Sequence, residues 1–167
     1  MVEVGLNPIE LEDLPLLQSW RNSPEVMTNC RQYRPLSMKD MMEWYQSKDT
    51  NTDYNLTTDL FLLTCNNRKV GVGGLVRIDW RNRIGELSFY IGLARYRNKK
   101  VIGKLLLSVV EHSFSTLGLR KVVFPVYSFN PLLPIYETLL KREYIAESEY
   151  YWEGKYWDRI ILVAYGK

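Results

Sequence analysis

Residues 83–117 place a strand, a short basic turn and a strongly amphipathic helix in immediate succession, and no other part of the chain constrains the fold as much. The stretch RIGELSFYI is rich in aliphatic and aromatic residues that favour strands. From Ile102 to Leu117, apolar residues recur at helical spacing and form one apolar face. A strand that leads directly into such a helix predicts a domain in which helices pack on a sheet.

The turn between this strand and this helix is cationic, with Arg97, Asn98, Lys99 and Lys100 just before the helix begins. A helix N-terminus presents unpaired backbone N–H groups and a partial positive charge, and both favour phosphate. The segment therefore indicates a pyrophosphate site. The alternative is an ordinary solvated turn of the kind found in any α/β domain.

The length of 167 residues predicts one domain, covering 1–167, that is large enough to bury a core. Hydrophobic residues make up 46% of the chain and charged residues 25%, which is typical of a soluble globular protein. The net charge of +3 suits an anionic ligand, but it is too small and too scattered to indicate nucleic-acid binding.

No secretory signal and no membrane-spanning run are visible, so we expect a cytoplasmic protein that does not enter a membrane. Cys30 and Cys65 lack the spacing of metal ligands, and His112 is the one histidine of the chain. We therefore expect no metal site. We also expect both cysteines to be reduced and His112 to be structural.

Apolar periodicity and turn residues divide the chain into about seven strands and four helices. The strands are expected at 2–9, 59–65, 70–80, 84–91, 121–129, 145–152 and 156–165. The helices are expected at 10–22, 38–47, about 101–117 and 132–142, with one more helical turn at 25–29 and a loop at 48–58. A meander of strands comes first and a βαβ crossover later, so the fold class is α/β with a mixed sheet.

Several short strings follow one another in a characteristic order: WRNSPEV at 20–26, GELSFYIG at 85–92, YR at 96–97, SFN at 128–130, IYE at 135–137 and GKYWD at 154–158. In this order they resemble the GNAT acyl-CoA N-acyltransferase superfamily, particularly its ribosomal-protein N-acetyltransferase-like branch. The resemblance spans nearly the whole chain. It implies a GNAT-like fold of mostly antiparallel strands with a central parallel pair. It also implies direct transfer of an acetyl group from acetyl-CoA to a primary amine.

The chain departs from this superfamily in the pyrophosphate loop, which there runs Gln/Arg-x-x-Gly-x-Gly/Ala. Counted from Arg97, the glycine positions hold Lys100 and Ile102, and Gly103 comes one residue late. Counted back from Gly103 instead, Asn98 takes the basic position and Val101 the first glycine position. Glycines let backbone N–H groups approach a pyrophosphate closely, so their loss weakens that contact. We expect lysines to compensate as point charges. The alternative is a non-catalytic domain of this fold that binds a ligand or a partner.

The resemblance implies that acetyl-CoA is the cosubstrate and that the fourth strand, the basic turn and the start of the long helix bind it. Backbone N–H groups around Phe89 to Ile91 would meet the pantetheine arm and the thioester carbonyl, and Asn130 would bind the pantetheine amides. The cosubstrate-binding residues expected from this match are Phe89, Tyr90, Ile91, Arg97, Asn98, Lys99, Lys100, Ile102, Gly103, Lys104 and Asn130.

Two residues are the catalytic candidates that the match implies. Glu86 on the fourth strand would be the general base, directly or through water; the alternative is a rim carboxylate paired with Arg83 or another cation. Tyr136 would donate a proton to the departing thiolate; the alternative is an aromatic residue that merely packs on its helix.

The acceptor pocket is expected between the first two helices and the C-terminal hairpin, with an aromatic and partly cationic lining. Such a lining suits a sugar or a nucleotide base, and a peptide also fits, so the partner is a small-molecule or peptide amine. An amino sugar or sugar nucleotide leads, and a protein N-terminus is the alternative. The hairpin aromatics could instead pack or form a homodimer contact. The substrate-binding residues expected are Arg21, Tyr33, Trp44, Ser88, Tyr150, Trp152 and Tyr156.

Overall fold

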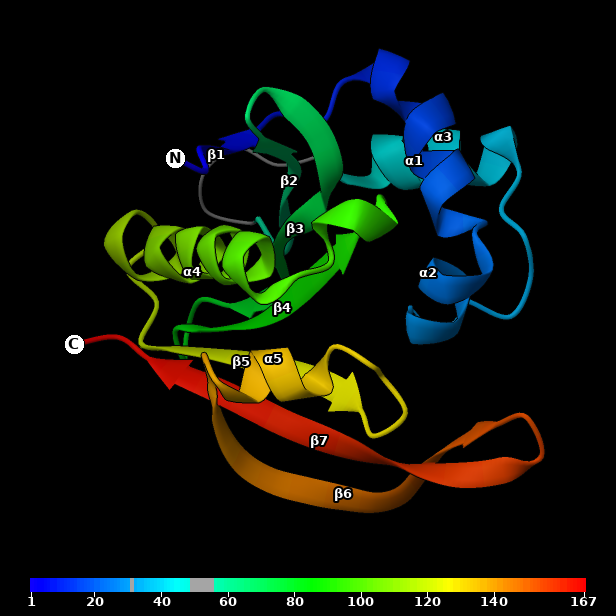
Figure 1. Ribbon diagram of the computed structural model, residues 1–167. Helices are drawn as coiled ribbons and strands as arrows, with labels where there is room; N and C mark the ends of the chain where they lie inside the picture. Colours follow the sequence, from blue (N-terminus) through cyan, green and yellow to red (C-terminus); the bar gives the residue numbers. More distant parts are fainter. Residues whose placement is uncertain (31, 49–55) are drawn as a thin grey trace.

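The computed structural model describes residues 1–30, 32–48 and 56–167 (Figure 1). Its strands form one sheet in the order β1-β2-β3-β4-β5-β7-β6. Among the described residues, β4 and β5 are the only neighbouring strands of this sheet that run parallel. The predicted mixed sheet with a central parallel pair is therefore confirmed. The strands are β1 (Val4–Asn7), β2 (Asp59–Cys65), β3 (Arg68–Asp79), β4 (Ile84–Ile91), β5 (Lys121–Tyr127), β6 (Lys141–Trp152) and β7 (Lys155–Tyr165).

Helices cover both faces of this sheet (Figure 1). The helices are α1 (Leu14–Arg21), α2 (Pro24–Asn29), α3 (Met38–Lys48), α4 (Lys99–Ser115) and α5 (Leu133–Glu137), with short 3-10 turns at Leu11–Asp13 and Ala94–Tyr96. On β2, Leu63 packs in the core under α4, whereas its neighbour Leu62 packs with α1 and α3. Successive residues of a strand point to opposite faces, so the sheet separates two apolar layers.

The long helix α4 buries the apolar face that the sequence predicts. Ile102, Leu105 and Leu106 are completely buried against the sheet. Asn98 is the N-cap of the helix: its Oδ1 atom accepts a hydrogen bond from the backbone N–H of Val101 at 3.1 Å. No helix among the residues that the structure describes is long and apolar enough to cross a membrane.

The predicted helix at 132–142 is wrong in its second half. The helix α5 ends at Glu137, and Lys141 already pairs with Val163 in the edge strand β6. The sequence predicted a longer helix, but pairing with β7 satisfies the backbone of β6 and overrides local preference. The first strand and the first helix are also shorter than predicted. Within the predicted loop at 48–58, residues 49–55 lie outside the described part of the chain.

A buried carboxylate ties the N-terminal segment to the sheet. Asp13 is only 2% exposed, and its Oδ1 atom accepts a hydrogen bond from the ammonium of Lys69 on β3 at 2.5 Å. Its other oxygen accepts the backbone N–H of Glu10 at 2.9 Å. The bond to Asp13 raises the pKa of Lys69 above its ordinary value, so the lysine stays charged. This pair fixes where α1 starts relative to β3.

We predict that Asp13→Asn lowers the free energy of unfolding by about 1–3 kcal/mol, because it leaves the Lys69 ammonium without its carboxylate partner. Urea denaturation followed by circular dichroism measures this change. Glu111→Gln is the control, since Glu111 is an exposed carboxylate on α4, and it should leave the unfolding midpoint within error of the parent. Equal midpoints for both variants would contradict the structural role of Asp13.

The end of β4 is held against α1 by a glycine. A Cβ atom at Gly92 would lie 2.2 Å from Cδ2 of Trp20, so only glycine lets the Trp20 ring rest on the strand end. Trp20 is itself 5% exposed and belongs to the apolar layer under α1 and α3. The close approach of this ring positions α1 over the carboxyl end of β4.

We predict that Gly92→Ala costs about 1–3 kcal/mol of stability through overpacking. Gly103→Ala is the control: its Cβ would meet only Leu139 at 3.8 Å, and the substitution should stabilise α4 by about 0.5–1 kcal/mol. Differential scanning calorimetry should place the two variants on opposite sides of the parent. A Gly92→Ala variant as stable as the parent would show that the contact does not position α1.

Candidate active site

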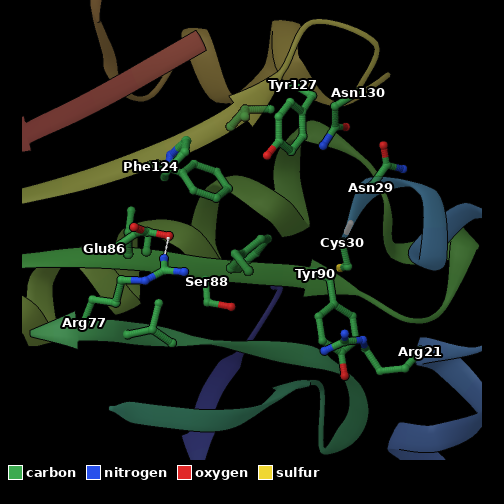
Figure 2. Close-up of a pocket in the computed structure, with 15 residues that line it drawn as sticks. Arg21, Asn29, Cys30, Arg77, Glu86, Ser88, Tyr90, Phe124, Tyr127 and Asn130 are labelled. Carbon is green, nitrogen blue, oxygen red and sulfur yellow. Dashed lines mark hydrogen bonds and ion pairs between the residues drawn. The ribbon is translucent and has the colours of Figure 1, made fainter. Parts of the chain in front are cut away.

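The parallel strands β4 and β5 separate soon after they meet. They pair only from Ile84 to Glu86, opposite Lys121 to Val123, although β4 continues to Ile91 and β5 to Tyr127. A cavity of about 290 Å³ opens where they part, lined by both strands, by the end of β3 and by α1 and α2 (Figure 2). The splay that the sequence alone could not establish is therefore present.

Backbone groups of β4 face this opening. The N–H of Gly92 donates to the carbonyl of Val70 at 2.8 Å, which fixes the phase of the antiparallel ladder with β3. In such a ladder alternate residues bond to the neighbouring strand, so the N–H groups of Phe89 and Ile91 point away from β3. No strand among the described residues pairs with them on the β5 side. These are the amides expected from the sequence to meet a pantetheine arm.

Side chains of β4 alternate across the sheet as its pattern predicts. Leu87, Phe89 and Ile91 are buried toward α4. The half-buried residues between them, Glu86 and Ser88, with Tyr90, face the cavity (Figure 2). The strand therefore supplies one face to the core and the other to the site.

A second cavity of about 110 Å³ continues the first. It shares Asn29, Cys30, Phe89, Tyr90 and Asn130 with the first cavity and adds Arg97, Leu132 and Tyr136. Because the walls are shared, the two cavities form one cleft that runs from Glu86 to Tyr136. The two catalytic candidates thus lie on the same cleft.

Tyr136 is held rigidly at one end of this cleft. Its ring lies edge-to-face against Phe124, with centroids 5.0 Å apart, and against Phe89 at 6.3 Å. The residue is 2% exposed, and its hydroxyl has no hydrogen bond within the described residues. Burial raises the pKa of Tyr136 well above its ordinary value. The phenol therefore stays protonated and can donate.

Glu86 carries an ion pair with Arg77, whose Nη1 atom donates to Oε1 of the carboxylate. The sequence left open a pairing of Glu86 with Arg83 or another cation, and the partner is Arg77 from the neighbouring strand β3. The Glu86 side chain is 23% exposed. It therefore remains reachable from the cavity.

The basic turn shapes the end of β4. The guanidinium of Arg97 donates to the carbonyls of Ile91, at 2.9 Å, and Gly92, at 3.2 Å. Asn98 is occupied as the cap of α4. The side chains of both expected cosubstrate ligands thus hold the turn together and bring the start of α4 to the carboxyl end of β4.

The first turn of α4 turns its branched side chains inward. Val101 and Ile102 are buried in the core. Ile102 stands where the family has a glycine, and its side chain therefore does not project over the N-terminus of the helix. Lys99 and Lys100 are exposed, and their backbone N–H groups make no hydrogen bond to another backbone group among the described residues. The ammonium of Lys104 instead donates to the carbonyl of Val2 at 2.6 Å.

The residues expected to bind the cosubstrate therefore fall into groups that lie in different places. Phe89, Tyr90, Ile91, Arg97 and Asn130 line the cleft. Lys99 and Lys100 lie at the helix end, whereas the side chain of Ile102 faces the core and Gly103 is buried beside Leu139.

The expected acceptor residues also divide into two groups. Arg21, Trp44 and Ser88 line a third cavity of about 270 Å³, which shares Arg21, Val76, Ser88 and Tyr90 with the first. The walls of these three cavities do not include the other four, Tyr33, Tyr150, Trp152 and Tyr156.

These four belong to the distal end of the C-terminal hairpin and the segment beside it. Tyr150 stacks on Tyr127, with ring centroids 4.2 Å apart, and on Trp152 at 6.2 Å. Because Tyr127 lines the first cavity, Tyr150 supports that wall from behind. Tyr33 lies 5.9 Å from the Trp152 ring, and Tyr33 and Tyr156 are 75% and 65% exposed, respectively.

Sequence patterns missed Asn29, Cys30, Arg77 and Tyr127, which all line the first cavity. Asn29 and Cys30 follow the string WRNSPEV closely, and this proximity was the available signal for them. The Oδ1 atom of Asn29 is buried without a hydrogen-bond partner in the described part of the chain. A buried orphan acceptor beside a cavity is suited to an N–H donor from a ligand.

Comparison with family models matches residues 3–132 to the acetyltransferase (GNAT) domain. The fold resembles spermidine N-acetyltransferase from Vibrio cholerae in complex with CoA and spermine, with a TM-score of 0.85 and 19% identity over 98% of this chain and 95% of that chain. It also resembles the spermidine/spermine N-acetyltransferase from Vibrio cholerae in complex with manganese ions, with a TM-score of 0.76 and 19% identity over 98% and 92% of the two chains.

The dodecameric form of the Vibrio cholerae spermidine enzyme gives a TM-score of 0.77 at 19% identity, over 97% of this chain and 93% of that one. At these identities the likeness shows the fold. Comparison with curated protein sequences gives no match. The family model covers most of the chain, and the cleft, beside β4 amides that no strand of the described residues pairs, reaches Arg97 in the turn before α4. The chain therefore belongs to the GNAT acetyltransferase family and is an acyl-CoA-dependent N-acetyltransferase with acetyl-CoA as its cosubstrate.

Proposed function

We propose that the protein acetylates the primary amine of a small molecule that binds in the first cavity, with Glu86 as general base and Tyr136 as general acid. One observation carries the proposal above the others. The cleft runs from the carboxylate of Glu86 to the hydroxyl of Tyr136 and passes the unpaired amides of β4 between them. A base, a carbonyl-binding group and an acid thus occur in the order that acyl transfer needs.

The residues around this cleft fit acetyl-CoA. The exposed N–H groups and ammonium groups of Lys99 and Lys100, at the N-terminus of α4, suit a pyrophosphate. The N–H groups of Phe89 and Ile91 suit pantetheine and the thioester carbonyl. Because the side chain of Ile102 lies in the core, the helix end needs no glycine there to stay open.

Acetyl-CoA supplies an activated acetyl group, whose C–S bond breaks as the amine nitrogen forms the new C–N bond. Glu86 first takes a proton from the ammonium and releases it to solvent, and it takes a second proton from the nitrogen once the amide forms. The β4 amides donate to the carbonyl oxygen as negative charge develops on it. Tyr136 gives its proton to the leaving sulfur and regains one from solvent. The net products are the acetamide, the free thiol and one proton.

For the acceptor we place an amino sugar or sugar nucleotide first, because Arg21 and Trp44 give the cavities cationic and aromatic walls. A protein N-terminus remains the second acceptor. A polyamine, the substrate class named for the Vibrio cholerae enzymes, would bring positive charge toward Arg21 and Arg77. The ribosomal-protein-like branch and a cytoplasmic location stay predictions from the sequence.

We predict that Glu86→Gln lowers kcat by about 10²–10⁴-fold, because the variant loses the general base while keeping the shape of the side chain. Release of CoA thiol, recorded with an amine panel at saturating acetyl-CoA, gives the rates. Glu111→Gln, on the exposed side of α4, is the control and should keep the parental kcat. Parental turnover by Glu86→Gln would exclude this residue as the base.

We predict that Tyr136 does not limit activity at high pH, because its raised pKa keeps the phenol protonated where an ordinary tyrosine ionises. The kcat of the parent should therefore not fall through loss of this proton up to about pH 10. Tyr136→Phe should lower kcat at every pH, whereas Tyr151→Phe, an exposed control, should not. A basic limb at about pH 8 that disappears in Tyr136→Phe would contradict this assignment.

A further inference from the structure

Two guanidinium groups and one carboxylate lie around the first cavity: Arg21, Arg77 and Glu86 (Figure 2). We infer that the acceptor is an amine that also carries an anionic group, either a phosphate or a carboxylate. This inference rests on the proposed function and names the substrate class of the same site. It is carried by the conformation of Arg77, by the pairing of Arg77 with Glu86, and by Arg21, which pairs with no carboxylate of the described residues.

A bulge in β3 turns Arg77 into the cavity. Alternation along a regular strand would place Arg77 on the same face as Leu75. Instead Leu75 and Ile78 both lie in the core under α4, while Val76 and Arg77 both line the cavity. The pairing of β3 with β4 shifts register between Val76 and Asp79, and Arg77 has a φ of 50°.

A non-glycine residue in this left-handed region is strained, and bulges beside binding sites commonly re-aim a side chain. The strain at Arg77 therefore coincides with a guanidinium delivered to the acceptor cavity.

Arg77 and Glu86 form an ion pair that a zwitterionic ligand can replace group for group. The arginine side chain is 67% exposed and that of Glu86 is 23% exposed, so both remain open to a ligand. An amine that bears an anion can offer its ammonium to Glu86 and its anion to Arg77. The exchange keeps every charge paired, and it leaves the amine on the group that we propose as the base.

Arg21 adds a cation that no carboxylate of the described residues neutralises. Its Nε atom donates to Oε1 of Gln32 at 3.0 Å, and its terminal nitrogens have no hydrogen bond within the described residues. Gln32 is 6% exposed, and its amide donates to Asn22 at 3.1 Å. A buried network of neutral groups thus orients Arg21, whose guanidinium lies 5.8 Å from the Tyr90 ring centroid.

The neighbouring carboxylate on the acceptor side does not cancel this charge. Asp40 lines the third cavity, but it accepts hydrogen bonds from Arg34 at 2.8 Å and from the hydroxyl of Ser37 at 2.7 Å. These bonds hold the pKa of Asp40 well below its ordinary value. The acceptor side therefore has a net positive charge among the residues described.

Matched amines test the inference. Glucosamine carries no anion, glucosamine 1-phosphate and glucosamine 6-phosphate each carry a phosphate, and muramic acid carries a carboxylate. Spermidine is the purely cationic comparison. We measure kcat/KM for each by CoA release, and affinity for each by calorimetry with CoA present. At least one anionic amine should have a kcat/KM about tenfold higher than that of glucosamine. A preference for the glucosamine phosphates would identify phosphate as the anionic group, and a preference for muramic acid would identify carboxylate.

Arg77→Gln and Arg21→Gln should each lower the ratio of kcat/KM for the anionic amine to kcat/KM for glucosamine severalfold, mainly by raising KM for the anionic amine. Arg21→Lys should keep part of this preference. Arg81→Gln is the control, because Arg81 is exposed on the same hairpin and lines none of the three cavities. It should keep the parental ratio.

The outcomes separate this inference from the proposed function. Turnover that favours glucosamine or spermidine overturns the inference and leaves the acetyltransferase proposal standing. Anion-selective binding without turnover of any amine supports the inference and counts against the proposed catalytic roles. If no amine binds and none is acetylated, both fail.

Discussion

The parallel pairing of β4 with β5 ends after three residue pairs, and the whole site depends on this early separation. Had the strands stayed paired, the amides of Phe89 and Ile91 would be consumed in the ladder and no cavity would exist between them. The core under α4 supports the separation from one side, where Tyr136 and Phe124 pack edge-to-face. On the other side, Arg21 of α1 and Asn29 of α2 line the opening.

The position of α4 follows from the same strand end. The guanidinium of Arg97 donates hydrogen bonds to the carbonyls of Ile91 and Gly92. This contact holds the start of α4 next to the end of β4 that carries the cleft-facing amides. The glycine pattern of the pyrophosphate loop is missing, yet the buried side chains of Val101 and Ile102 leave the helix end clear. We propose that phosphate is attracted here by the helix end and by lysine charge rather than by a glycine-rich backbone. The altered loop is therefore compatible with the acetyltransferase family.

The sequence predicts the architecture well and the site in part, for physical reasons. Periodicity and turn residues locate β4 and α4, because each buries one apolar face that local spacing reveals. The β4 residues that face the cleft can be predicted from the alternation of buried and half-buried side chains along the strand. Arg77 could not be found this way, since its bulge and positive φ invert the alternation. The hairpin aromatics line none of the three cavities, and Tyr150 and Trp152 stack on each other. Their part in acceptor binding stays a prediction. That 1–167 is one domain, and that it forms a homodimer, stay predictions.

Amide hydrogen exchange of β4 tests the central claim most directly. Ser88 and Tyr90 donate toward β3, whereas Phe89 and Ile91 face the cleft. NMR of the free protein should show fast exchange at Phe89 and Ile91 and slow exchange at Ser88 and Tyr90, and addition of CoA should slow the first two selectively. Uniformly slow exchange along β4 before CoA is added, or no response to CoA at Phe89 and Ile91, would contradict the open cleft on which catalysis is built.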